Sequence, residues 1–435
     1  MAKTFRPYLP EQELLLPPSL RDWLPENHLA YFVGDVVDEL DLSAIESVYA
    51  DDRGQPPYHP RMMTKILIYA YCVGVFSSRK MQKRLVEDIA FRVLAAGNQP
   101  DFRTLSDFRK IHLKALGNLF EQVLKIALEA GAMRLGRVAL DGSKVKANAS
   151  KHKAMSYARM HETEKRLREE VQQLLAQAEA TDAEEDCRYG SDRHGEELPA
   201  ELARRETRMR RIRDAKRILE RRAREQVKAQ GKPRAEVQKA KPEDKAQYNF
   251  TDPESRIMKS ADGFVQAYNA QIAVEPDFQM IVGQTVTQAP NDKQQIVPMV
   301  EKIEAQAGEK PGVVLADSGY CSEPNLEYLG KQHIEGYIAT ERHPHGVVEP
   351  ARRGRLPKGA TCVDRMRRKL QTKAGKAIYA ARKGIVEPVF GQIKHARGFR
   401  QFLLRGLAKV QGEWALVCVS HNILKLYDLC YRQAA

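Results

Sequence analysis

Residues 137–143 read RVALDGS, and this stretch decides the fold. Arg137–Leu140 is a short apolar run typical of a buried strand, and Asp141 follows it directly. Residues 312–320, GVVLADSGY, repeat the pattern, with an apolar strand that ends in Asp317. An Asp at the carboxyl end of a buried strand points into the crevice where open α/β sheets bind ligands. Asp-Gly is also an ordinary turn dipeptide, so the first signal is weak when it is taken alone.

Three further strands are expected on either side of residues 312–320. Gly263–Val274 and Met280–Thr287 show strand patterning and are separated by a short turn, which predicts a hairpin. Ile334–Ala339 is expected to form the fifth strand. Residues 343–375 are rich in Pro, Gly and Arg, which predicts a loop along a nucleic acid or a partly disordered segment. Helices are expected at residues 294–306, 324–331 and 410–429.

A single acid, Glu387, stands in the basic stretch YAARKGIVEPVFGQIK, residues 379–394. Residues 351–410 hold seventeen Lys or Arg against two acids, a net +15, while the whole chain is +14. A basic surface of this density faces a polyanion, most often nucleic acid. A lone carboxylate would weaken phosphate binding there unless it has another task, such as holding a divalent metal ion against a phosphate.

The helix that carries Glu387 is expected to begin around residues 385–387. Pro388 supports this start, because Pro suits the first turn of a helix and disfavours helical geometry in the residue before it. Glu387 and Lys394 are seven residues apart, two helical turns, so they share one side of that helix.

Five strands with helices around them, and acids at the ends of three elements, fit a ribonuclease H-like five-stranded mixed sheet in an α/β fold. Three carboxylates that converge repel one another, so such a site is stable mainly with cations bound. Hard oxygen ligands favour Mg²⁺ or Mn²⁺ over zinc. Two such ions can clamp the attacking and leaving oxygens of an in-line phosphoryl displacement.

The chain has 435 residues, which predicts two domains, or one domain with a large insertion. Its start has no apolar core for a signal peptide, and the longest apolar run, Ile66–Phe76, is too short to span a bilayer. Six scattered cysteines without a Cys-x-x-Cys pair disfavour a disulfide framework and indicate a reducing, cytoplasmic location. A pI near 9.4 makes nucleic acid the leading partner, although a ribosomal or membrane-surface protein would also suit it.

The first part of the chain is expected to be mostly helical. Helices are predicted at Met62–Val75 and Arg79–Leu94, and a third, capped by Thr104 or Ser106, is predicted to end at Leu128. Basic residues on the second helix fit a helix-turn-helix-like DNA reader, or equally the solvated face of a packing module.

Residues 151–250 are heavily charged with both signs and indicate an insertion. Helices are predicted at Ala158–Ala180 and Leu198–Gln230, with a turn-rich joint at Cys187–Gly195. Heptad-like spacing of apolar residues in the first helix predicts a helical hairpin or coiled coil. The second helix carries a basic flank of six arginines: Arg204, Arg205, Arg208, Arg210, Arg211 and Arg213. This flank could lie along DNA, but a solvated face of the coiled coil is the favoured interpretation.

Motifs over nearly the whole length resemble one family, the DDE transposases of bacterial insertion sequences, of the type numbered eleven-eighty-two in the group-four assemblage. They occur in the family's order, and they are Tyr58-His59-Pro60, Pro100-Asp101-Phe102, Phe108-Arg109, Ala139–Lys144, Ala147–Ser150, Tyr268–Gln271, Leu315–Tyr320, Val386–Gly391 and Lys394. The group-four pattern has tyrosine, two residues, arginine, three residues, glutamate, six residues and lysine. Here four residues separate Arg382 from Glu387, so the roles of Tyr379 and Arg382 rest on a looser match.

The resemblance implies a role for each matched residue. Asp141, Asp317 and Glu387 would hold two metal ions. Arg382 and Lys394 would contact phosphates near the cleaved end, Arg by a bidentate grip and Lys as a point charge. Tyr379 would stack on a base or pack its helix. Asn291 and Asp292, ahead of a helix, cap it or touch the DNA end, and capping is the favoured role.

The resemblance also implies an activity. The chain would be a metal-dependent transposase that cuts the terminal inverted repeats of its element and joins the freed 3′-hydroxyls to target DNA. It would work on double-stranded DNA at the nucleoid, as at least a homodimer, since two ends must be paired. We expect a helical DNA-binding domain over residues 1–130 and a catalytic domain over residues 131–435. The alternatives are a stand-alone metal-dependent nuclease and a catalytically dead DNA-binding protein derived from a transposase.

Overall fold

A mixed β-sheet lies at the centre of the molecule. The computed structural model describes residues 19–49, 56–189, 200–260, 263–341, 357 and 359–432. The sheet has six strands in the order β4-β5-β1-β7-β8, and β6 also pairs with β5. These strands are β1 (Arg137–Lys146), β4 (Arg256–Ser260), β5 (Gly263–Val274), β6 (Ile281–Thr287), β7 (Val313–Ala316) and β8 (Glu335–Ile338).

The pairing of the strands combines an antiparallel half with a parallel half. β5 runs antiparallel to β1, β4 and β6, whereas β7 is parallel to both β1 and β8. All five predicted strands are present, but the predicted strand count is wrong, because β4 adds a sixth. β4 escaped prediction because its sequence, RIMKS, buries only Met258 and so lacks the alternation that marks a half-buried strand. The coarse prediction of a mixed α/β fold, consistent with a ribonuclease H-like core, is confirmed.

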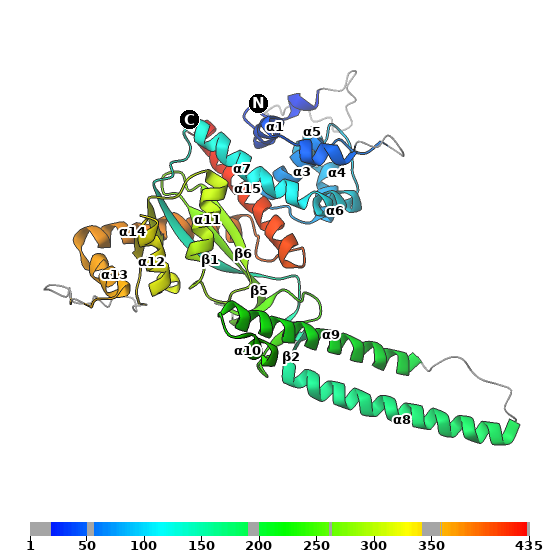
Figure 1. Ribbon diagram of the computed structural model, residues 1–435. Coiled ribbons are helices and arrows are strands. Elements are labelled where there is room, and N and C mark those ends of the chain that lie inside the picture. The colour runs from blue at the N-terminus through cyan, green and yellow to red at the C-terminus, as the bar shows by residue number, and fades with distance from the viewer. Residues whose placement is uncertain are drawn as a thin grey trace, which may run out of the picture.

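Helices cover the sheet. α11 (Ile296–Ala307) and α15 (Leu407–Arg432) pack on β6, while α14 (Lys373–Gly391) packs against β1. α15 also runs beside α7, which Figure 1 shows as two adjacent long helices. Trp414 of α15 is fully buried, and its indole Nε1 donates to the Gln271 carbonyl at 3.3 Å. No helix in the described ranges is both long enough and apolar enough to cross a membrane.

The N-terminal helices share one apolar core with the sheet. They are α1 (Leu29–Glu39), α2 (Ser43–Glu46), α3 (Pro60–Cys72), α4 (Ser78–Glu87), α5 (Ile89–Leu94), α6 (Phe102–Ile111) and α7 (Leu113–Glu129), with 3-10 turns at Leu20–Trp23 and Ser47–Tyr49. The predicted single helix Arg79–Leu94 is wrong, because the Asp88 side chain accepts from Ala90 N at 3.0 Å and starts a new helix. Asp101, rather than Thr104 or Ser106, caps α6, and the predicted third helix is wrong as a single element, because it is divided at His112 into α6 and α7.

A long helical arm projects from the sheet (Figure 1). It consists of α8 (Tyr157–Tyr189) and α9 (Ala200–Ala229), followed by α10 (Arg234–Lys239). Its root is a small antiparallel pair, β2 (Ala154–Ser156) with β3 (Gln247–Asn249), after the 3-10 turn Lys151–Lys153. The arm has a separate apolar core of Tyr157, Met160, Leu167, Ile212, Ala215, Leu219 and Tyr248. α8 continues to Tyr189, so the predicted turn-rich joint is helical at its start, and residues 190–195 of it lie outside the described residues.

The predicted loop over residues 343–375 is helical in its second half. Two short elements precede it, the 3-10 turn Ser318–Tyr320 and α12 (Glu323–Lys331). α13 (Cys362–Gln371) begins with a capping box between Thr361 and Asp364, and α14 starts at Lys373. The Glu323 carboxylate adds to this start by accepting the backbone N–H groups of Cys362 and Val363 at 2.9 and 3.0 Å. Residues 342–356 and 358 lie outside the described residues.

Candidate active site

The topology brings the two predicted aspartates together. β1 and β7 are parallel neighbours, with Ala139 opposite Leu315, and two residues further along each chain come Asp141 and Asp317. Burial raises the pKa of Asp141 to about 6, and the Asp317 and Asp292 carboxylates raise it too. Arg382 and the N–H of Gly142, at 2.8 Å, oppose this rise. Negative charge therefore gathers where β7 ends, beside the middle of β1. The prediction that the first strand ends at Leu140 is wrong, because β1 continues to Lys146 by pairing with β5.

A third aspartate, Asp292, belongs to the same cluster. Its Oδ1 accepts from Asn269 Nδ2 at 2.6 Å and Gln271 Nε2 at 2.7 Å, and Lys144 Nζ lies 3.5 Å away. Asp292 precedes α11, which begins at Ile296 and has Gln295 as its cap residue. The favoured prediction that its side chain caps the helix is therefore wrong, because buried amides of β5 bind it instead.

Two glycines keep the cluster compact. A Cβ atom on Gly142 would lie 2.1 Å from Gln271 Nε2 and 2.8 Å from Asp292 Oδ1, so no side chain fits there. A Cβ atom on Gly319 would lie 3.0 Å from Asp317 Oδ1 and 3.6 Å from Asp292 Oδ2. The carboxylates of Asp317 and Asp292 thus flank one glycine.

Arg382 of α14 lies over Asp141. Its Nη1 is 3.8 Å from Asp141 Oδ2, and its side chain is only 9% exposed. Among the residues that the structure describes, its Nε and Nη1 have no hydrogen-bond partner, which is costly for a buried guanidinium. Burial and both aspartates raise the pKa of the Tyr379 hydroxyl, while Arg382 lowers it. Tyr379 therefore lies near these three charged side chains. Two unpaired donors beside an aspartate are suited to an anion that the crevice would receive.

Lys394 contacts β1 close to Asp141 in the chain. Its Nζ donates to Ser143 Oγ and, at 3.3 Å, to the carbonyl of Lys144. Glu387 is exposed on α14, and its carboxylate has no hydrogen bond or ion pair with the described residues. α14 and the residues directly after it thus bring Arg382 and Lys394 to β1, whereas Glu387 is not among the charges that act on Asp141.

The helix that carries these residues does not begin at residues 385–387. α14 starts at Lys373, a dozen residues earlier than predicted, and Pro388 lies inside it. Pro388 has no N–H to donate to the carbonyl of Gly384, and Gln279 Nε2 donates to that carbonyl instead at 3.3 Å. This side-chain bond explains how the helix continues through Pro388. A π-helical turn, Gln392–Ala396, follows and contains Lys394.

The predicted acids do not by themselves form a closed ligand set. Within the described ranges, one group of three His, Cys, Asp or Glu side chains has all its ligand atoms within 4.8 Å of one another. This group is Glu323, Glu327 and Cys362. Glu323 caps α13 there, so this group has a structural role. Asp141 and Asp317 nevertheless supply the hard oxygen donors that Mg²⁺ and Mn²⁺ prefer. A bound cation would offset the burial, and also the repulsion by Asp317 and Asp292, that raise the pKa of Asp141.

Comparison with known families gives two matches. A model described as "Transposase domain" matches residues 18–111, which include helices α1 to α6, and one described as "Transposase DDE domain" matches residues 237–423. The second match includes Asp292, Asp317, Arg382, Glu387 and Lys394, whereas Asp141 lies between the two. No curated protein and no solved structure matches the chain.

Both matches describe transposases, and the second describes the DDE domain, whose members work on DNA with divalent metal ions. The structure places Asp141 and Asp317 near each other, with Arg382, which has two donors without hydrogen bonds among the described residues, beside Asp141. The resemblance of the motifs is thereby confirmed at the level of the family: this chain belongs to the DDE transposases of insertion sequences.

Proposed function

We propose that this transposase cuts the terminal inverted repeats of its element in the crevice between β1, β7 and α14, and joins the freed 3′-hydroxyls to target DNA there. The observation that carries the proposal is the half-satisfied Arg382: a buried guanidinium with two unpaired donors beside Asp141. A scissile phosphate would accept from those donors. The charge-assisted hydrogen bonds would then offset the cost of burying Arg382.

The crevice fits a pair of Mg²⁺ or Mn²⁺ ions held by Asp141, Asp317 and Glu387. When bound, such ions activate a water or 3′-hydroxyl and stabilise the departing 3′-oxygen. Asp141 binds a cation only as a carboxylate, which its position between the N–H of Gly142 and Arg382 favours. Glu387 is the least supported ligand, since its carboxylate is exposed and unpaired within the described residues. DNA binding would have to bring it to the aspartates.

The remaining residues of the crevice position the substrate. Lys394, held against Ser143 and the Lys144 carbonyl, places a positive charge beside β1 for a phosphate near the cleaved end. Tyr379 lies one turn before Arg382 and offers a ring to a base. Asp292 holds Asn269 and Gln271 in place and so supports the floor of the crevice from β5.

The wider architecture extends the proposal. The five strands β6-β5-β1-β7-β8 form the ribonuclease H-like core, with β4 as an addition. Residues 1–130 act as the DNA-binding domain, and the catalytic domain of residues 131–435 is interrupted by the 151–250 insertion. Two copies form a homodimer, since two element ends must be paired. The chain belongs to the eleven-eighty-two type, acts at the nucleoid and uses two metal ions.

Three alanine variants test the catalytic assignment: Asp141→Ala, Asp317→Ala and Glu387→Ala. Each should abolish strand cleavage of a duplex carrying the element's end, measured on gels, while electrophoretic mobility shifts show binding largely intact. Glu301→Ala, an exposed acid on α11, is the matched control and should cleave normally. Loss of DNA binding in all three variants would count against a metal site.

A comparison with Asp292→Ala separates the outcomes further. If Glu387→Ala cleaves normally and Asp292→Ala does not, Asp292 replaces Glu387 as the third ligand. Wild-type cleavage without joining of 3′-ends to a target duplex would favour the stand-alone nuclease. Sequence-specific end binding without any cleavage would favour the dead, transposase-derived protein.

A further inference from the structure

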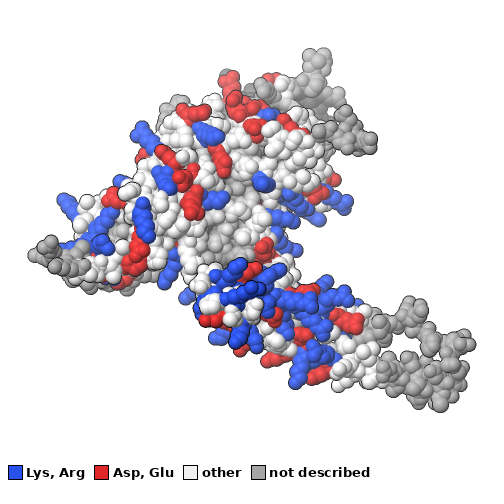
Figure 2. All heavy atoms as spheres, in the orientation of Figure 1, with Lys and Arg blue, Asp and Glu red and all other residues white. Residues whose placement is uncertain are grey.

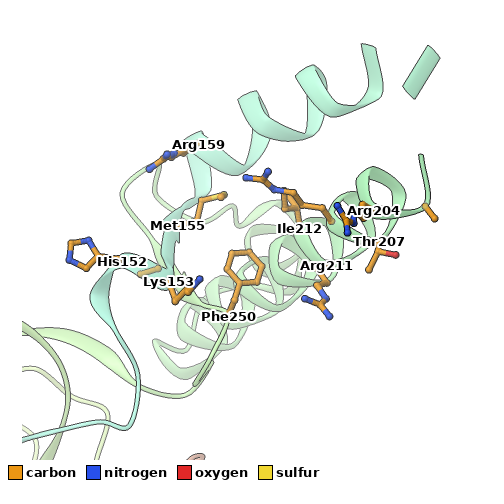
Figure 3. Close-up of a pocket in the computed structure, with 12 residues that line it drawn as sticks. His152, Lys153, Met155, Arg159, Arg204, Thr207, Arg211, Ile212 and Phe250 are labelled. Atoms are coloured by element: carbon orange, nitrogen blue, oxygen red, sulfur yellow. The ribbon is translucent and has the colours of Figure 1, made fainter. Parts of the chain in front are cut away.

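A basic pocket lies at the root of the arm, away from the catalytic crevice. Its volume is about 760 Å³, and it opens between the loop before β2, the start of α8 and one face of α9 (Figure 3). The face of α9 contributes Arg204, Thr207, Arg208 and Arg211, which recur at the spacing of one helical face. Lys153, Arg159 and the ring of Phe250 complete it.

The cations of this pocket are unpaired. Its lining includes no acid, and within the described residues Lys153, Arg159, Arg204, Arg208 and Arg211 make no ion pair. The cations on the adjacent face of α9, which faces α8, are paired instead. Arg213 and Lys216 contact Glu164 at 2.9 and 2.8 Å, and Arg205 contacts Glu170 at 3.0 Å.

The arginines of the predicted basic flank therefore fall into two groups in the folded chain. Some neutralise the acids of α8 and hold the arm together, while Arg204, Arg208 and Arg211 gather at the pocket with their charge uncompensated. Figure 2 shows Lys and Arg side chains concentrated at this root of the arm. Uncompensated guanidinium groups around a cavity favour an anionic ligand.

An aromatic ring stands among these charges. Phe250 is 36% exposed, and its edge-on contact with Tyr248, at 5.3 Å between centroids, holds the ring in place. Its backbone N–H also donates to the Lys153 carbonyl at 3.1 Å. Guanidinium groups that accept a phosphate, next to an exposed ring that accepts a base, are the elements of a nucleotide-binding surface.

A second cavity lies next to this pocket. Its volume is about 740 Å³, it shares Ala154 with the first pocket, and it reaches Lys293, directly after Asp292. Its lining has no acid and is rich in amides and cations, among them Arg256 and Gln266. Gln266 is 5% exposed, and within the described residues its Oε1 has no hydrogen-bond partner. Cations and amides thus line the molecule from the pocket as far as the two neighbours of Asp292 in the chain, Asn291 and Lys293.

We propose that the pocket at the root of the arm binds one nucleotide of the DNA strand that leaves the catalytic crevice, with its phosphates on Arg204, Arg208 and Arg211 and its base against Phe250. The proposal rests on the proposed function, since it assigns a second contact on the same DNA. It makes the arm a DNA-holding element and not only a solvated hairpin.

The charge side of the proposal is tested by the salt dependence of DNA binding by the full-length protein. The probe is a short duplex of arbitrary sequence with a single-stranded 3′ overhang. The variant Arg204→Ala/Arg208→Ala/Arg211→Ala should reduce the slope of log affinity against log salt by about two units, because each lost phosphate contact removes roughly 0.7 to 0.9. The control Arg210→Ala/Arg221→Ala/Arg224→Ala removes three exposed arginines from the opposite face of α9 and should keep the slope.

The possible outcomes are distinct. An unchanged slope in the first variant, or an equal loss in both, would overturn the pocket assignment. If the wild type bound DNA without any salt dependence, the proposed function itself would fail, whatever the variants did.

The stacking side of the proposal is tested by Phe250→Ala. This variant should weaken binding of the overhang probe by roughly five- to a hundredfold, in line with one lost base–ring contact. The slope should be unchanged, and a blunt duplex should be bound as before. Phe250→Trp keeps a ring and should restore binding. Equal affinity of Phe250→Ala and wild type for the overhang probe would exclude a stacked base.

Discussion

At the scale of single residues, Asp141 links stability to function. Its pKa of about 6 in the folded protein exceeds its ordinary value of 3.8, mainly because the side chain is buried. A raised carboxyl pKa means that the folded state holds the proton more tightly than the unfolded state. Its contribution to stability is therefore present below pH 3.8 and is lost as the pH rises through about 6. At neutral pH the metal-free protein carries an unfavourable charge at this residue.

Asp141→Asn should therefore stabilise the metal-free protein while removing a metal ligand. We expect the free energy of unfolding to rise by on the order of 1–3 kcal/mol near pH 7.5, and by less near pH 4.5. Urea denaturation with a chelator present measures both values. Asp35→Asn, at an exposed position of α1, is the control and should show no such pH-dependent gain. Added Mg²⁺ should raise the wild type's stability but not the variant's, and a variant destabilised at both pH values would refute the account.

The residues of the crevice were predictable to different degrees. Asp141 and Asp317 each come directly after an apolar run, a local signal, and the parallel pairing of β1 with β7 brings them together, although β1 continues past Asp141. The place of Asp292 beside them was missed, because its partners Asn269 and Gln271 are more than twenty residues away in the chain. The signal was present in β5, where two amides alternate on one face of a strand that is otherwise apolar. Buried amides of this kind need a polar partner.

At the scale of elements, α14 shows where a local rule fails. Pro388 predicts a helix start, yet the helix extends from Lys373 to Gly391, because Gln279, from a turn more than a hundred residues earlier, donates to the carbonyl of Gly384. A tertiary hydrogen bond cannot be foreseen from the spacing of Pro and its neighbours. Pro388 lies between Arg382 and Lys394, the two side chains that reach β1. The π-turn that contains Lys394 follows the end of α14. Such irregular turns recur at functional sites.

Pro388→Ala tests whether this irregularity serves the reaction. Restoring the N–H to Gly384 should raise the free energy of unfolding by roughly 1–3 kcal/mol, since Pro disfavours a helix interior by about 3 kcal/mol relative to Ala. Strand cleavage should fall, because a regular helix would turn Lys394 away from Ser143. Gly384→Ala is the matched control: its added Cβ meets nothing within 4 Å, so it should stabilise α14 and leave cleavage unchanged. Normal cleavage by Pro388→Ala would show that the irregularity has no catalytic role.

At the scale of the whole molecule, the arm and the sheet were predicted separately, but their relation was not. Charge and heptad-like spacing predicted the helices of the insertion, and apolar runs predicted the strands. The small pair β2 and β3, which joins arm to sheet, is too short to leave a pattern in the sequence. The separate core of the arm also depends on Tyr248, which lies far along the chain from Tyr157. Two cores indicate two units that can open independently.

Met160→Ala tests this independence. Met160 is fully buried in the arm's core, and its truncation should cost about 2–5 kcal/mol, enough to open α8 and α9 locally. Amide hydrogen exchange should speed up over residues 157–229 and remain slow in β1 and β5. Met299 is an equally buried methionine of α11 in the main core. Met299→Ala should speed up amide exchange in β1 and β5 and leave exchange over residues 157–229 slow. If DNA is held at the root of the arm, Met160→Ala should also lower the salt slope of DNA binding, whereas faster exchange throughout the sheet would show that arm and sheet unfold as one unit.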